Sequence, residues 1–180
     1  MKAIGFCGLP GSGKSSSIDA IRDLGEVVTM GDVVRNEARK RGIELNDDNL
    51  GKIARELREK HGPEILAEKC VELINNINSE VVFIDGVRSV FEVNVFKKSW
   101  KFPLIAINLD DKSRFKRLSE RGRSDDPKSI EELKERDKRE VGFGLEDVIN
   151  RADYIVFNSS TIEDLKRKTK EIVLEIIENY

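Results

Sequence analysis

The sequence is poor in cysteine, histidine and long apolar runs. No stretch approaches the roughly 18 apolar residues of a membrane span, and the start of the chain, MKAIGFCGLPGSGKS, lacks the hydrophobic region of a signal peptide. Cys7 and Cys70 have no CxxC or paired metal-ligand spacing, which favours reduced structural cysteines. The one histidine, His61, lies in a charged segment where we expect it to face solvent. We therefore predict a cytoplasmic protein with no membrane partner.

Neither sign of charge dominates the chain. Lys and Arg total 32 and Asp and Glu total 34, so the net charge of −2 gives no reason to expect nucleic acid as a partner. Any anion site must therefore be a local concentration of arginines. Glutamine is absent, prolines are few and Lys, Arg and Glu are abundant, a balance found in proteins from hot environments. This composition predicts a melting temperature above the usual mesophile range.

Short apolar runs alternate with helical patterns along the chain. The length of 180 residues suits one domain with one well-buried core. The runs are almost continuously hydrophobic, which is typical of strands covered on both faces in a parallel sheet. The alternation predicts an α/β, doubly wound P-loop NTPase fold with a five-stranded parallel sheet. The expected strands are Lys2–Cys7, Glu26–Thr29, Val81–Ile84, Leu104–Leu109 and Tyr154–Phe157.

Two segments between the expected strands are longer than an ordinary crossover. Residues 32–76 hold two or three helical patterns, with Asp47 as a cap and a break at Gly62 and Pro63. Residues 112–148 contain few large apolar side chains and can bury little. We predict a helix at Lys14–Leu24 that Gly25 stops. The expected single domain 1–180 has a core of 1–31, 77–111 and 149–180, an acceptor-binding insertion at 32–76 and a lid at 112–148.

Residues 8–15, GLPGSGKS, match the phosphate-binding pattern GxxxxGK[ST] and lie between an apolar strand and a helix. Glycines let the backbone curl so that successive N–H groups converge on phosphate oxygens. Lys14 would reach the β- and γ-phosphates, and the Ser15 hydroxyl would ligate Mg²⁺. The pattern therefore predicts ATP and Mg²⁺ as cofactors. The expected ATP-binding residues are Gly8, Leu9, Pro10, Gly11, Ser12, Gly13, Lys14 and Ser15.

Asp85 directly follows the third expected strand. Open α/β sheets bind ligands at the carboxyl ends of their strands, and P-loop proteins keep a magnesium-organising acid there. We expect Asp85 and Ser15 to hold the metal. A second interpretation stays open, in which Asp85 caps the turn DGVRS.

Three further segments resemble adenylate kinases. MGDVVR at 30–35 resembles the TGDxxR segment of that family, and IDGVRS at 84–89 resembles its DGFPR segment with one residue fewer. GRSDD at 122–126, with the later Arg136, is similar to the arginines and aspartates that flank the lid, at slightly longer spacing. The chain also looks from end to end like archaeal adenylate-kinase-related proteins. The resemblance covers most of the chain in order.

The resemblance implies roles for particular residues. Asp32, Arg35 and Arg88 would bind the acceptor, a nucleotide-like small molecule such as AMP. Arg123 and Arg136 would stabilise the transition state together with Lys14 and Asp85. The implied activity is ATP-dependent phosphoryl transfer to a nucleoside monophosphate.

Phosphoryl transfer independently requires positive charge around the transferring group, because its transition state spreads negative charge over the equatorial oxygens. Arg114, Arg117 and Arg121 fall at i, i+3 and i+7 of one predicted helix and share a face. Arg136 and Arg139 do likewise on the next helix. A solvated charged surface remains the other interpretation of these arginines.

Asp32 divides the possible mechanisms. A monophosphate acceptor is already ionised, so Asp32 would orient Arg35 or cap a helix, whereas a hydroxyl acceptor requires a general base, for which Asp32 is well placed. RADYIVFNSSTIEDL at 151–165 resembles dephospho-coenzyme A kinases, which phosphorylate a hydroxyl. Within it, Asn158 and Ser159 occupy the position of an adenine-contacting loop. A nucleotide-binding regulator or slow ATPase without an acceptor is the third hypothesis.

Overall fold

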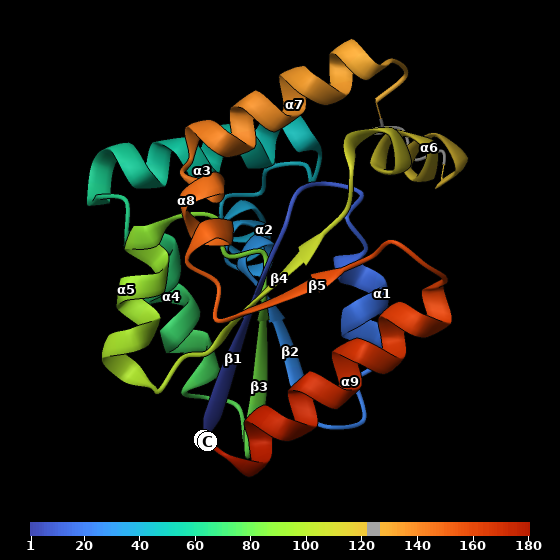
Figure 1. The fold of residues 1–180 in the computed structure, drawn as a ribbon. Coiled ribbons are helices and arrows are strands. Elements are labelled where there is room, and N and C mark those ends of the chain that lie inside the picture. Colours follow the sequence, from blue (N-terminus) through green and yellow to red (C-terminus); the bar gives the residue numbers. More distant parts are fainter. Residues whose placement is uncertain (122–126) are drawn as a thin grey trace.

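A parallel sheet forms the centre of the molecule (Figure 1). The structure is a computed structural model and describes residues 1–121 and 127–180. The strands run in the order β2-β3-β1-β4-β5, and every pair of neighbours is parallel. This confirms the predicted five-stranded α/β architecture. Their bounds are β1 Lys2–Cys7, β2 Glu26–Thr29, β3 Val81–Asp85, β4 Leu104–Asn108 and β5 Tyr154–Phe157.

Helices cover both faces of the sheet. α1 and α9 lie on one face, whereas α2, α4, α5 and α8 lie on the other, and α3 and α7 pass over the end of the sheet where the strands finish (Figure 1). The bounds are α1 Lys14–Asp19, α2 Met30–Lys40, α3 Asp47–His61, α4 Ile65–Ile74, α5 Val90–Ser99, α6 Asp111–Arg121, α7 Ile130–Gly142, α8 Leu145–Asn150 and α9 Ile162–Glu178. None of these helices is long and apolar enough to cross a bilayer.

The sheet separates two apolar cores. Along β1, Ala3 and Cys7 join the core beneath α2, α4, α5 and α8, whereas Ile4 and Phe6 join the core beneath α1 and α9. This alternation follows from the two-residue period of a strand. Burial on both faces explains why the strand sequences are almost continuously hydrophobic. Cys7 and Cys70 are both buried and free, as the sequence predicted.

Helix α1 ends earlier than the sequence predicted. It stops at Asp19, and the following turns use hydrogen bonds between residues three apart, such as Ile21 N–H to the Ile18 carbonyl at 3.1 Å. This tighter winding still buries Ile18 and Ile21, so the apolar spacing was correct although the helix length was not. Gly25 ends the segment where a Cβ would lie 2.5 Å from the Val81 carbonyl oxygen, a distance that excludes any side chain.

The cap of α3 also differs from the expectation. Asn46 is the N-cap residue, and its side chain accepts a hydrogen bond from the Asn49 N–H at 2.9 Å. Asp47 is therefore the first helical residue, because Asn46 already fills the capping position one residue earlier. The predicted break after α3 is confirmed, since Gly62 ends the helix with a φ of 95°.

Candidate active site

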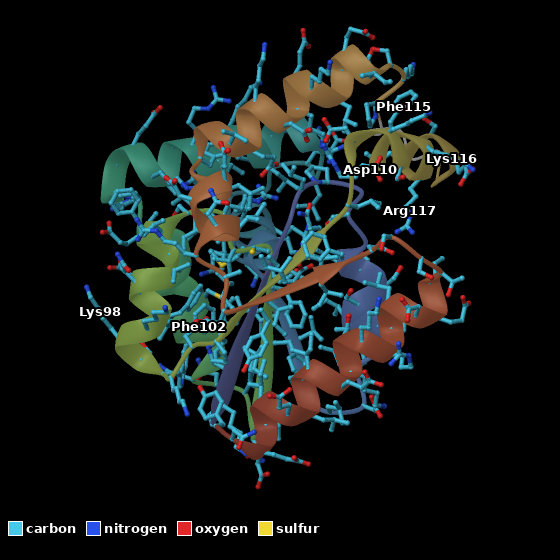
Figure 2. All side chains as sticks on the ribbon, viewed as in Figure 1. Lys98, Phe102, Asp110, Phe115, Lys116 and Arg117 are labelled. Atoms are coloured by element: carbon cyan, nitrogen blue, oxygen red, sulfur yellow. The ribbon has the colours of Figure 1, made fainter. Side chains whose placement is uncertain are left out.

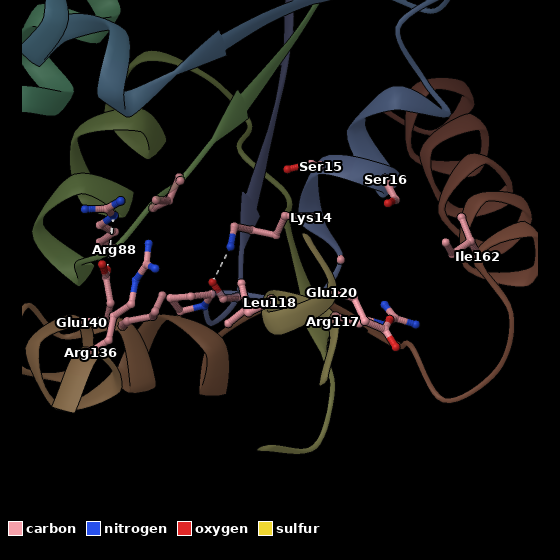
Figure 3. Close-up of a pocket in the computed structure, with 17 residues that line it drawn as sticks. Lys14, Ser15, Ser16, Arg88, Arg117, Leu118, Glu120, Arg136, Glu140 and Ile162 are labelled. Carbon is pink, nitrogen blue, oxygen red and sulfur yellow. Dashed lines mark hydrogen bonds and ion pairs between the residues drawn. The ribbon is translucent and has the colours of Figure 1, made fainter. Parts of the chain in front are cut away.

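A pocket of about 640 Å³ lies at the carboxyl ends of the strands (Figure 3). Its walls come from the phosphate-binding loop and the start of α1, the loop after β3, and helices α6 and α7. Arg88, Arg136 and Glu140 gather at one end, whereas Arg117, Glu120 and Ile162 lie at the other, with Lys14 between them (Figure 3). This position is the usual ligand site of an open α/β sheet.

The phosphate-binding loop depends on its glycines. Gly8, Gly11 and Gly13 have φ values of 144°, 78° and 110°, which side chains rarely adopt. A Cβ at Gly8 would lie 2.4 Å from the Ile107 carbonyl oxygen, so the loop also packs too closely for a side chain. The curled backbone holds the Lys14 ammonium, which donates to the Gly8 carbonyl at 2.6 Å.

Lys14 and Asp85 form the electrostatic centre of the site. Burial lowers the pKa of Lys14, and the negative charge of Asp85 partly offsets this effect. Burial likewise raises the pKa of Asp85, whereas Lys14 and Arg88 act in the opposite direction. Oδ1 of Asp85 is buried without a hydrogen-bond partner, which is unusual for a carboxylate. Asp85 is the last residue of β3 and lies opposite Phe6 of β1, so the loop after the strand begins directly behind it.

Two oxygen-bearing side chains could hold a magnesium ion. Ser15 lines the pocket beside Lys14 (Figure 3). The orphaned carboxylate oxygen of Asp85 supplies a second hard ligand. Mg²⁺ takes oxygen ligands, commonly one or two from protein and the rest from water and phosphate. The residues present therefore fit this ion.

Asn158 supports the loop from the opposite side. Its Nδ2 donates to the Ser12 carbonyl at 2.8 Å, and its Oδ1 accepts from Nη2 of Arg117 at 3.1 Å. Figure 2 shows Arg117 extending from α6. Because both ends of the buried Asn158 amide are engaged within the chain, its role here is to position the loop and Arg117. Ser159, expected beside it at the nucleotide base, is exposed.

Arg114 is not a pocket arginine. Its side chain is fully buried and donates to the Pro10 carbonyl at 2.9 Å, to Oδ1 of Asp137 at 3.1 Å and to Oδ1 of Asp111 at 2.8 Å. It thus connects the phosphate-binding loop to α6 and α7. Arg117 lines the pocket, whereas the internal contacts of Arg114 keep its side chain out of both the pocket and the solvated surface. Arg123 and the side chains of Arg121 and Arg139 lie outside the described residues.

Asp32 and Arg35 form a local unit at the start of α2. Thr29 is the N-cap residue of α2, and Oδ2 of Asp32 accepts a hydrogen bond from the Thr29 N–H at 3.0 Å. Asp32 is therefore the third helical residue of a capping box rather than the cap itself. Nη1 of Arg35 donates to Oδ1 of Asp32 at 2.9 Å. Both side chains are nearly half exposed. Of the three residues expected to bind the acceptor, all of which the structure describes, only Arg88 lines the pocket.

Arg88 and Arg136 reach the same end of the pocket from different elements. Arg88 follows β3, whereas Arg136 lies on α7 one helical turn before Glu140. Nε of Arg88 is 3.4 Å from Oε2 of Glu140 (Figure 3). The structure thus brings two predicted arginines together and adds a carboxylate that the sequence did not indicate.

A buried carboxylate fixes the backbone of Arg88. Oε2 of Glu92 accepts the N–H groups of Arg88 at 2.8 Å and of Ser89 at 3.2 Å, and its Oε1 accepts from Arg58 at 3.1 Å. Arg58 also lies over the ring of Phe143, 5.1 Å from its centroid. The spacing of Ser89 and Glu92 is that of a capping box and could have revealed Glu92. Nothing local to Arg58 signals its long-range partner.

Comparison with known proteins places this chain in a family. A sequence model described as AAA domain matches residues 4–141. A UPF0200 protein of Hyperthermus butylicus is 43% identical and covers 92% of this chain and 90% of its own length. A UPF0200 protein of Methanocaldococcus jannaschii is 42% identical over 99% of this chain and 92% of its own. A UPF0200/UPF0201 protein of Archaeoglobus fulgidus is 50% identical over 99% of this chain, which spans only 57% of that longer relative.

Solved structures share the fold at low identity. Shikimate kinase from Bacteroides thetaiotaomicron aligns with a TM-score of 0.65 at 16% identity, over 96% of this chain and 98% of its own. Shikimate kinase from Aquifex aeolicus aligns with a TM-score of 0.57 at 17% identity, over 98% and 97%. Together with the family match, these likenesses show a kinase-like P-loop fold. The chain therefore belongs to the UPF0200 family and contains an AAA domain.

Proposed function

We propose that the protein uses ATP and Mg²⁺ to phosphorylate a nucleotide-like small molecule, of which a nucleoside monophosphate such as AMP is the leading candidate. The observation that carries the proposal is the shared pocket, which Lys14 of the phosphate-binding loop lines together with Arg88 and Arg136 at one of its ends. A phosphoryl group passing between two bound molecules needs cationic groups on both sides, because its transition state spreads negative charge.

The ATP phosphates would lie on the loop formed by Gly8 to Ser15. Its backbone N–H groups and Lys14 would contact the β- and γ-phosphates. Ser15 and Asp85 would hold Mg²⁺, which supplies charge neutralisation at these phosphates. Coordination would also give the orphaned oxygen of Asp85 a partner and favour its ionised form.

The acceptor phosphate would bind Arg88, whose planar guanidinium can contact two phosphate oxygens at once. Arg136 lies beside it and would stabilise the transferring group. Arg123 keeps its proposed role as a second such arginine. The engagement of both Asp32 oxygens with Thr29 and Arg35 supports an acceptor that needs no general base, as a monophosphate does.

A hydroxyl-directed kinase is the second candidate. Asp32 follows β2 at the same sheet edge as Asp85 and is close enough for its charge to raise the pKa of Asp85. A nearby carboxylate of this kind could accept a proton from a hydroxyl. The shikimate kinases that share the fold are named for a hydroxylated acceptor, which makes such molecules worth assaying.

An acceptor panel tests the proposal. The protein is incubated with Mg²⁺, ATP and, in turn, nucleoside monophosphates, nucleosides, dephospho-coenzyme A and shikimate, while ADP and the phosphorylated product are measured. A monophosphate should give stoichiometric ADP and nucleoside diphosphate. Product from a hydroxyl acceptor alone would favour the second candidate. ADP at one basal rate, whichever acceptor is added, would refute both and leave a slow ATPase.

A further inference from the structure

Glu140 places a carboxylate inside a pocket otherwise suited to anions. Its side chain is 16% exposed, and Oε2 lies 3.4 Å from Nε of Arg88. Its negative charge also reaches Lys14, where it opposes the effect of burial on the pKa of that ammonium. The other carboxylate among the described pocket residues, that of Glu120, is largely exposed and lies at the opposite end (Figure 3).

The contact between Glu140 and Arg88 is loose. Its single nitrogen-to-oxygen distance of 3.4 Å exceeds that of a well-formed hydrogen bond. Arg88 remains 46% exposed, so incoming molecules can reach its guanidinium. Arg114 differs, because its side chain is fully buried and hydrogen-bonded to both Asp137 and Asp111. A ligand can therefore displace Glu140 from Arg88 more easily than it could displace Asp137 or Asp111 from Arg114.

We propose that Glu140 pairs with Arg88 when no acceptor is bound. A phosphate dianion can displace Glu140 from Arg88, whereas a monocarboxylate cannot. The inference rests on the proposed function in one respect, which is that Arg88 binds the acceptor. Glu140 then acts as a specificity-determining residue for phosphate-bearing acceptors.

The physical reason is competition between a tethered anion and a free one. Glu140 is attached to α7 beside Arg88, so its effective concentration is on the order of millimolar or higher. A free monocarboxylate brings the same charge and the same two oxygens, and gains nothing by replacing it. A phosphate dianion brings nearly twice the charge and a third oxygen, so it forms the stronger bidentate pair.

The test measures binding rather than turnover. The protein is first saturated with Mg²⁺ and a non-hydrolysable ATP analogue, so that added phosphate cannot bind at Gly8 to Ser15. It is then titrated calorimetrically with inorganic phosphate, AMP and acetate. In Glu140→Gln, which keeps the shape but removes the charge, phosphate affinity should rise roughly two- to fivefold, the equivalent of one partly exposed ion pair. Acetate binding should become measurable only in this variant.

Glu120→Gln is the matched control, because it removes the same charge from the opposite end of the pocket. Its phosphate affinity should equal that of the wild type. Adding Arg88→Gln to Glu140→Gln should abolish the gain. Should Glu140→Gln fold poorly, Glu140→Asp retracts the carboxylate from Arg88 while keeping its charge, and should give a smaller gain of the same sign.

The outcomes separate this inference from the proposed function. A gain for phosphate without any binding of AMP supports the role of Glu140 and removes AMP as the acceptor. Equal phosphate affinity in the wild type and Glu140→Gln overturns the role of Glu140. An equal rise in Glu120→Gln, or no phosphate binding in any variant, overturns it as well.

Discussion

The two ends of the pocket are held in different ways. The phosphate-binding loop is fixed by glycine conformations and by the buried side chains of Asn158 and Arg114, each of which hydrogen-bonds a loop carbonyl. The proposed acceptor end, formed by Arg88, Arg136 and Glu140, relies on an ion pair in which the Arg88 side chain is nearly half exposed. The loop is therefore preorganised by the fold, whereas we expect the proposed acceptor end to exchange its contacts when a ligand arrives.

This difference has an energetic counterpart. Removing one partner of a buried ion pair typically costs about 3–5 kcal/mol, whereas an exposed pair contributes roughly 0.2–1 kcal/mol. Substitutions that loosen the loop should therefore impair both stability and nucleotide binding. Substitutions at the acceptor end should alter specificity while the protein stays folded.

Replacing Lys14 should have the largest effect on activity. Lys14→Ala removes the one ammonium that the loop holds at its centre. Turnover of ATP should fall by about 10²–10³, the usual result of removing a preorganised electrostatic contact. The measurement is ADP release at saturating ATP, with Lys98→Ala as control because Lys98 is exposed on α5 (Figure 2). Equal turnover in both variants would contradict the assigned site.

Replacing Arg114 should have the largest effect on stability. Arg114→Met leaves the mostly buried Asp137 carboxylate without its partner and should lower the free energy of unfolding by about 3–5 kcal/mol, whereas the exposed Asp111 contributes little to this loss. Urea denaturation measures the change. Arg22→Met is the control, because its pair with Asp19 is exposed on both sides and should contribute no more than about 1 kcal/mol. Similar losses in the two variants would abolish the contrast between buried and exposed pairs.

Replacing Asn158 should destabilise the conformation of the phosphate-binding loop without creating a cavity in the apolar cores. Asn158→Ala leaves the buried Ser12 carbonyl unpaired, at a cost of about 1–3 kcal/mol. ATP affinity, measured by calorimetry, should fall together with stability because the same contact shapes the loop. Asn76→Ala removes an exposed amide hydrogen bond to the Glu72 carbonyl and should change neither. Lost stability with unchanged ATP affinity would show that the loop does not depend on Asn158.

Replacing Asp32 tests whether this carboxylate acts as a general base. Asp32→Asn weakens the capping box and the pair with Arg35, and should lower stability by at most about 1 kcal/mol. Turnover with a monophosphate acceptor should remain within tenfold of the wild type. A general base would instead make turnover fall by about 10²–10⁴. Kinetics with the acceptor identified in the panel separate these outcomes.

The smallest expected effect concerns the reactivity of the two buried thiols, Cys7 and Cys70. Burial raises the pKa of Cys7 and of Cys70 to about 12, from 9.0. Both thiols should therefore stay unreactive toward iodoacetamide in the folded protein at pH 8 and react on unfolding. In the unfolded protein the thiols ionise from about pH 9, whereas in the folded protein they stay neutral up to about pH 12. The stability that their burial contributes is therefore fully present below pH 9 and is lost as the pH rises from 9 to 12. Rapid labelling of the native protein at pH 8 would contradict this.

The sheet and the phosphate-binding loop were predictable because their signals are local. Strand periodicity and the spacing of GLPGSGKS are each complete within a few neighbouring residues. The length of α1 was not predictable in the same way, because the apolar spacing of Ile18 and Ile21 suits both an α-helix and the tighter turns that replace it.

Most contacts that sequence reasoning missed join residues that are distant in the sequence, although the local capping-box spacing of Ser89 and Glu92 could have revealed Glu92. Helical spacing placed Arg114 and Arg117 on one face of α6, but it could not show that Arg114 would be buried with a hydrogen bond to Asp137. Arg58 and Glu92 meet across 34 residues, and the pairing of Arg88 with Glu140 likewise joins separate elements. Such contacts are set by the packing of helices, which a single sequence does not display.

The buried side chains that support the phosphate-binding loop, Arg114 and Asn158, are synthesised after the loop itself. The motif leaves the ribosome before its supports, because Arg114, which supports Pro10, lies 104 residues further on and Asn158, which supports Ser12, lies 146 residues further on. Contacts of such long sequence separation form late, because the intervening chain must be ordered first. We therefore expect the nascent chain to carry the phosphate-binding sequence before the complete phosphate-binding site forms, because Asn158 directly follows β5.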